Sequence, residues 1–173
     1  MKSIEMILAI VVTISFLLKV SFMSRRMQLV VALVCGVFAW LSMGWMTHIS
    51  HDVFTQALVG RPSLLNLGVC LTIEAIVMMA WCFTSRPSPL TYYPGLLVAA
   101  AVCYVQAQLL WLLPGSSFTL MAWLSAVGVF LLTLLGNRLL CWLMPEPPLR
   151  KEMLFIVSLM VLLLCIVITG VPI

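Results

Sequence analysis

The sequence predicts an all-α integral membrane protein, a polytopic bundle of about six transmembrane helices joined by short hairpin loops in one domain over residues 1–173. Hydrophobic residues make up 64% of the chain and charged residues only 8%, against roughly 25% charged residues in soluble domains. The mean hydropathy is +1.23. A water-soluble fold of this size could not bury so much apolar surface. We therefore expect the lipid bilayer to surround most of the chain.

Six apolar runs have about the length that crosses roughly 30 Å of hydrocarbon as a helix. They are predicted to span residues 4–23, 27–47, 64–84, 92–113, 118–143 and 152–172. The first run is longer than the core of a signal peptide, so we expect a mature helix. If two neighbouring runs merged, or one lay flat, the count would be five.

The breaks between these runs are mostly short, which predicts tight hairpins between antiparallel helices. In chain order they are Ser24-Arg25-Arg26, the connection from His48 to Ser63, Arg86-Pro87-Ser88-Pro89, Pro114-Gly115-Ser116-Ser117 and the proline-rich segment 145–151. Only the connection from His48 to Ser63 has room for a further element, and its apolar positions suit a short interfacial helix. The prolines of segment 145–151 argue against a merger of the last two runs.

Lysine and arginine are concentrated on one side of the predicted membrane. The loops after the first, third and fifth runs carry basic residues that are predicted to be cytoplasmic and to be candidate contacts to a partner, Arg25, Arg26, Arg86, Arg150 and Lys151. Lys19 and Arg138 lie near the same helix ends, and we expect both to extend to the interface. The opposite side has only Lys2 and Arg61. These loops are therefore predicted to be cytoplasmic, with both termini outside, in a bacterial cytoplasmic membrane.

Glu74 is the acidic residue nearest the middle of a predicted span. An acidic residue at a helix centre costs about 2.5–3.5 kcal/mol on insertion scales, so such residues usually face a partner or a water-filled path. The functional interpretation is a proton or cation relay, or a contact to a polar ligand or another subunit. The structural interpretation is a neutral carboxylic acid bonded to a nearby helix, where Gln106 and Gln108 lie at a comparable depth. The sequence does not choose between them.

Polar residues on the third and fourth spans form a candidate cluster around Glu74. Gln106 and Gln108 are two positions apart on a helix and point in nearly opposite directions, so at most one of them can meet Glu74. Thr72 adds a hydroxyl on the same span as Glu74. The predicted relay or polar cluster therefore contains Glu74 and Thr72, together with Gln106 or Gln108.

The segment from His48 to Asp52 is a candidate metal site at the outer end of the second span. In a helix, spacings of three and four residues place His48, His51 and Asp52 on one face. Imidazole and carboxylate ligands suit a divalent transition metal. The segment does not match the HExxH pattern, however, and polar residues are expected at a membrane boundary in any case. We therefore favour a solvated helix end over a metal centre.

Small residues recur every four positions along the fourth span, at Gly95, Ala99, Cys103 and Ala107. Such a seam lets another backbone approach closely, so this face is predicted to pack against protein. The first and sixth spans are mostly Ile, Leu, Val and Met, with little small-residue patterning. We expect these two spans to be peripheral, against lipid or a partner. All six cysteines lie in apolar runs and are expected to act as small hydrophobic residues.

The sequence disfavours several classes of function. It has no glycine-rich phosphate loop, no Ser/His/Asp set and no histidine pair in facing spans, which argues against ATP hydrolysis, acyl transfer and haem-based electron transfer. No cofactor is strongly implied. The basic residues are scattered, which argues against a nucleic-acid partner.

The favoured interpretation is a small subunit of a transport or ion- or proton-conducting membrane complex. Such a subunit needs other membrane subunits as partners, because the chain carries no energy-coupling domain. One alternative is a membrane-embedded enzyme that uses a metal at His48, His51 and Asp52. The other is a structural or assembly protein that depends on its helix-packing seam. Enzymatic activity is less favoured than a transport role.

Overall fold

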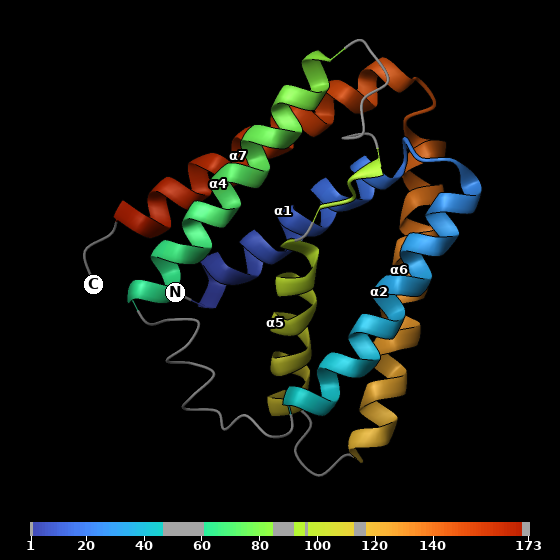
Figure 1. Ribbon diagram of the computed structural model, residues 1–173, viewed down its shortest axis with the longest axis vertical. Helices are drawn as coiled ribbons and strands as arrows, with labels where there is room; N and C mark the ends of the chain where they lie inside the picture. Colours follow the sequence, from blue (N-terminus) through green and yellow to red (C-terminus); the bar gives the residue numbers. More distant parts are fainter. Residues whose placement is uncertain (1, 47–60, 85–91, 96, 113–116, 171–173) are drawn as a thin grey trace.

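The computed structural model describes residues 2–46, 61–84, 92–95, 97–112 and 117–170. The helices, labelled as in Figure 1, are α1 (Lys2–Val20), α2 (Arg25–Met46), α4 (Arg61–Phe83), α5 (Leu97–Leu112), α6 (Phe118–Leu143) and α7 (Pro147–Gly170). The described residues contain no strand, which confirms the all-α class. Most of the predicted runs match these helices to within a few residues. The exceptions are the fourth run, because α5 begins five residues after the predicted residue 92, and the sixth run, because α7 begins five residues before the predicted residue 152.

Within the described residues, three helices are long and apolar enough to cross a membrane. They cover Arg25–Trp45 of α2, Asn66–Phe83 of α4 and Phe118–Leu143 of α6. Apolar segments of α1 and α5 are shorter, over Met6–Val20 and Leu97–Leu110. The three long helices indicate a membrane protein.

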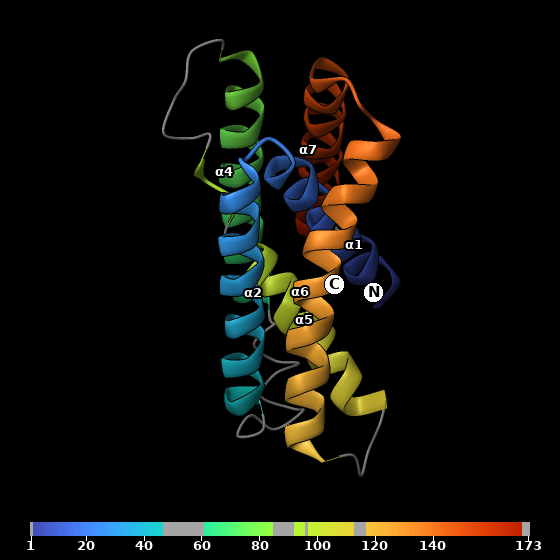
Figure 2. The ribbon, with the colours of Figure 1, turned by 90° about the vertical axis from the view of Figure 1, so that its right-hand side faces the viewer.

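The helices form two packed pairs with the other two helices between them. The most extensive contacts in the described chain join α2 to α6 and α4 to α7. α1 crosses between the two pairs and contacts α5, α6 and α7, as Figures 1 and 2 show. α5 packs mainly on α1 and α2. Contacts from both pairs therefore converge on α1 and α5.

The first helix is central, so the prediction that the first span is peripheral is wrong. Phe16, Leu18 and Val20 of α1 are 4%, 1% and 0% exposed. Phe16 and Val20 belong to a core cluster that reaches α2, whereas Leu18 packs with Trp81 of α4. A helix of Ile, Leu and Val can face lipid or other helices equally well, because lipid tails are as apolar as these side chains. Composition therefore does not distinguish a central helix from a peripheral one.

Polar and apolar side chains are distributed as expected for a protein in lipid. The outer face of α6 exposes a stripe of large apolar side chains, Leu120, Leu124, Leu131, Leu135 and Leu139. The buried positions of α6 are instead Met121, Ser125, Thr133 and Asn137. Apolar residues outside and hydroxyl or amide groups inside are the arrangement that a hydrocarbon solvent favours.

One end of the bundle collects several helix ends that carry basic residues. The turn between α1 and α2, the end of α4 and the turn between α6 and α7 lie in the upper part of Figure 1. The end of α2 and the start of α6 lie at the opposite end. Arg25 and Arg26 are exposed at the first end, and Arg150 and Lys151 are half-buried there.

Candidate functional site

Glu74 lies near the middle of α4 and faces the beginning of α5. It stands nine residues before Phe83, the last residue of α4, which at 1.5 Å per residue places it roughly 13 Å inside the helix end. Its carboxylate accepts a hydrogen bond from the Leu97 backbone N–H at 3.1 Å and another from the Tyr93 hydroxyl at 3.5 Å. Leu97 is the first residue of α5. The carboxylate therefore accepts from one of the N–H groups that a helix start leaves without an intrahelical partner.

α5 begins inside the bundle rather than at its end (Figure 1). Its 16 residues extend over roughly 24 Å, less than the hydrocarbon thickness of about 30 Å. Residues 93–95, just before it, have no regular secondary structure. Irregular backbone at membrane depth is tolerated only where protein buries it or where it lines a water-filled cavity. Glu74 supplies a polar partner at this point.

Gly95 makes the close approach of this segment to Glu74 possible. Its φ of +103° lies in a region that side-chain-bearing residues rarely adopt. A Cβ atom at this position would lie 2.7 Å from Oε1 of Glu74 and 3.3 Å from the Met78 methyl carbon. Gly95 therefore serves both the backbone conformation and the space for the carboxylate.

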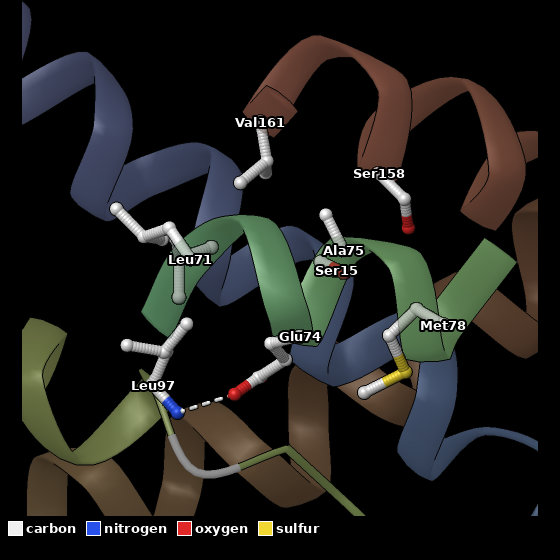
Figure 3. Close-up of a pocket in the computed structure, with 9 residues that line it drawn as sticks. Ser15, Leu71, Glu74, Ala75, Met78, Leu97, Ser158 and Val161 are labelled. Atoms are coloured by element: carbon white, nitrogen blue, oxygen red, sulfur yellow. Dashed lines mark hydrogen bonds between the residues drawn. The ribbon is translucent and has the colours of Figure 1, made fainter. Parts of the chain in front are cut away.

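Glu74 also lines a cavity between four helices. α1 contributes Val12 and Ser15, α4 contributes Leu71, Glu74, Ala75 and Met78, α5 contributes Leu97, and α7 contributes Ser158 and Val161. Figure 3 shows these side chains around the pocket, with the Glu74 carboxylate directed at the Leu97 nitrogen. The space open to the centres of water molecules is about 20 Å³, and roughly 10–15 Å³ is enough to hold one water. A carboxylate and two serine hydroxyls beside a space of this size can exchange a proton with water or hold a small cation.

Gln106 belongs to a different polar cluster, so the alternative in which Glu74 bonds to Gln106 is wrong. Its side-chain amide donates to the Ala39 carbonyl oxygen at 2.6 Å and to the Ser125 hydroxyl at 3.1 Å. Its carbonyl oxygen accepts from the Ser42 hydroxyl at 2.7 Å. Gln106 is 1% exposed. This cluster joins α2, α5 and α6, away from the Glu74 cavity.

Thr72 and Gln108 do not line the Glu74 cavity. Thr72 donates to the Val69 carbonyl oxygen of its own helix at 2.8 Å, a local bond that any helical threonine can make. Gln108 is half-buried on α5 two positions beyond Gln106. The predicted polar cluster therefore divides, and Glu74 alone of its members lines the cavity.

The small-residue seam is shorter than predicted, because Gly95 precedes α5 instead of lying on it. Of the three remaining members, Ala107 is buried, and Ala99 and Cys103 are half-buried. α5 packs on α1 and α2. His48, His51, Asp52 and Arg86 lie outside the described residues. Within the described ranges, no group of three or more His, Cys, Asp or Glu residues is placed to hold a metal ion.

Lys19 does not extend to the membrane interface as predicted. It is 0% exposed, and its Nζ lies 3.1 Å from the centroid of the Trp81 ring. This Nζ has no hydrogen-bond partner in the described structure. The expectation failed because Trp81 of α4 and Leu154 of α7 pack over the end of α1 and cover the ammonium group.

The residues that sequence reasoning missed are Tyr93 and Leu97 as partners of Glu74, Ser15 and Ser158 in the cavity, and Trp81 over Lys19. One signal could have found the first two. Pro94 and Gly95 form a Pro-Gly dipeptide, a strong turn signal, inside the run that was predicted as one helix. The two serines carried no such signal, since each lies singly in an apolar run.

No protein-family model matches the chain, and the searches of curated proteins and of solved structures also found no match.

Proposed function

We propose that this chain is a small integral membrane subunit of a transport or ion- or proton-conducting complex, with Glu74 as the exchanging group. The observation that carries the proposal is the cavity lined by Glu74, Ser15 and Ser158 at the point where α5 begins. An intramembrane carboxylate beside a space large enough for water is a typical element of a proton or cation pathway. Helices that begin at membrane depth are likewise typical of transporter sites.

The proposed topology has six spans in a bacterial cytoplasmic membrane. The basic ends at Arg25, Arg26, Arg150 and Lys151 would be cytoplasmic, and both termini would lie outside. α1 and α5 are short for independent spans, but each is covered by neighbouring helices, which lowers the need for a full apolar length. The chain would require partner subunits, since its described part offers no site for an energy source.

The Leu97 hydrogen bond supports a second candidate, in which Glu74 only stabilises the start of α5 within a structural or assembly protein. Glu74→Gln separates the two candidates. Glutamine keeps a carbonyl oxygen that can accept from the Leu97 N–H, but it cannot exchange a proton. Glu74→Leu removes both the acceptor for the Leu97 N–H and the exchangeable proton.

The experiment begins with purification of the tagged chain in mild detergent and mass spectrometry of co-eluting proteins. The recovered assembly is then reconstituted in vesicles, and proton and Na⁺ or K⁺ flux is measured under an imposed potential. If the proposal is correct, Glu74→Gln co-elutes with the same partners, and the flux through its assembly falls by at least about tenfold. Unchanged flux in Glu74→Gln, with disrupted assembly in Glu74→Leu, would instead establish the structural role.

A further inference from the structure

Three basic side chains gather around two aromatic rings where α1 and α4 end and α7 begins. Lys19 Nζ lies 3.1 Å and Lys151 Nζ lies 5.1 Å from the centroid of the same Trp81 ring. The Arg150 guanidinium carbon lies 5.3 Å from the centroid of the Phe22 ring, which packs edge-on against Trp81 at 5.1 Å. Both ammonium groups therefore lie close to the Trp81 side chain.

This basic cluster of Lys19, Arg150 and Lys151 has no carboxylate partner among the described residues. Lys19 Nζ and Arg150 Nε are buried and make no hydrogen bond there. Arg150 is otherwise held by the Ser21 carbonyl oxygen at 3.1 Å and the Cys141 sulfur at 3.3 Å. The rings offset part of the charge through cation–π contacts. Unpaired buried cations are unfavourable, so an anion that meets the half-buried Arg150 and Lys151 from outside the chain would offset the charge of the cluster.

The surface next to the cluster is apolar and continues along the helices. Cys82 Sγ contacts the Lys151 carbonyl oxygen at 3.6 Å, which places the end of α4 beside the first turn of α7. One residue further, Phe83 is 76% exposed, and its ring meets the Phe155 ring at 5.5 Å. Phe155 is one turn beyond Lys151 on α7, and the exposed Leu159 follows one turn later. Charge at the helix end and apolar surface below it match the two parts of a phospholipid.

We propose that the basic cluster binds the phosphate group of an anionic phospholipid, with an acyl chain lying over Phe83 and Phe155. Basic pockets between transmembrane helices are suited to anionic head groups. Nη1 of Arg150 is bonded to Ser21 and its Nε is buried, so Nη2 is the donor that remains for phosphate. Lys151 is a half-buried point charge beside it. Lys19 adds positive charge from beneath Trp81. The apolar face favours a lipid over an acidic protein segment as the source of the anion.

The test uses the chain purified in a nonionic detergent. Thermal unfolding gives its melting temperature, and native mass spectrometry detects the bound lipid. Phosphatidylglycerol, phosphatidylcholine and inorganic phosphate are added separately. Phosphatidylglycerol should stabilise the wild type more than phosphatidylcholine does. Lys151→Gln should weaken phosphatidylglycerol binding by about fivefold, the change that corresponds to roughly 1 kcal/mol per basic residue.

Arg138→Gln is the matched control, because Arg138 is an exposed basic residue of α6 outside the cluster. It should keep wild-type lipid binding. Lys19→Met should raise the melting temperature of the lipid-free chain and lower its response to phosphatidylglycerol. Equal stabilisation of the wild type by inorganic phosphate would confirm a phosphate site but identify the soluble ion as its occupant.

Two further results would overturn the proposal. One is equal stabilisation of the wild type by phosphatidylglycerol and phosphatidylcholine, with no response to phosphate, which would leave an acidic protein partner as the source of the anion. The other is equal loss of binding in Arg138→Gln and Lys151→Gln, which would indicate diffuse attraction instead of a built site.

Discussion

The backbone N–H of Leu97 donates a 3.1 Å hydrogen bond to the carboxylate of Glu74, so the first residue of α5 is bound to the middle of α4. This bond explains why a carboxylate can be accommodated at this depth in an apolar helix. Helix starts attract negative charge, because their N–H groups lack intrahelical partners and the helix dipole is positive there. The same contact also places Glu74 at the cavity that contains Ser15 and Ser158.

Replacement of Glu74 should separate its hydrogen bonding from its charge. Glu74→Gln keeps an acceptor for the Leu97 N–H, so we expect the free energy of unfolding to change by less than about 1 kcal/mol. Glu74→Leu leaves that N–H without its partner and should destabilise the protein by about 1–3 kcal/mol. Unfolding in mixed detergent micelles measures both. Equal losses in the two variants would show that the bond to Leu97 does not stabilise the fold.

Gly95→Ala should destabilise the protein by about 1–3 kcal/mol, because the new Cβ requires an unfavourable positive φ. That Cβ would also lie 2.7 Å from Glu74 Oε1. Gly128→Ala is the control with the opposite expected sign. Gly128 is within α6, and a Cβ there has open space around it, so alanine should stabilise the helix by about 0.5–1 kcal/mol. If Gly95→Ala left the stability unchanged, the close approach of Gly95 to Glu74 would be contradicted.

Gln106→Leu should loosen the contact of α5 with α2 and α6. Gln106 bonds to Ser42 on one side and to Ser125 on the other. The expected loss is about 1–2 kcal/mol, since hydrogen bonds between membrane helices are individually modest. Thr72→Val, which removes only a bond to the Val69 carbonyl oxygen of the same helix, should be nearly silent. Thermal unfolding of both variants in detergent measures the two losses. Equal losses would contradict the contacts described for Gln106.

Cysteine labelling tests the proposed topology. In a variant free of native cysteines, Ser24→Cys and Glu146→Cys should react with a membrane-impermeant maleimide from the same side, because both exposed positions lie at the basic end of the bundle. Ser117→Cys, just before α6, should react from the other side. Labelling of Ser117→Cys and Glu146→Cys from one side would show that α6 does not cross the membrane.

The sequence was sufficient for the helices and insufficient for their packing. Long apolar runs locate α2, α4 and α6 because the energy of insertion depends mainly on composition and length. Whether α1 faces lipid or protein could not be read in the same way, since Ile, Leu and Val suit both. The burial of Lys19 followed from that central position, and the general tendency of lysine to extend to the interface did not apply.

The candidate site was also predicted in part. Glu74 stood out because a carboxylate in an apolar run is costly. Its partners could not be found by searching for polar side chains at the same depth, because the shorter of its two described bonds comes from the Leu97 backbone. Gln106 was the more conspicuous candidate, but its amide meets the serines of α2 and α6 instead.

The most direct test of the account asks whether Glu74 exchanges its proton with water. Infrared difference spectra of the wild type and of Glu74→Gln are recorded during a pH titration of the reconstituted protein, in H₂O and in D₂O. The account predicts a carboxylic acid band that is absent in Glu74→Gln, that titrates reversibly and that shifts in D₂O, because the cavity admits water. A Glu74 band that neither titrates nor shifts in D₂O would contradict the account, since a carboxyl group sealed from water cannot serve as a relay.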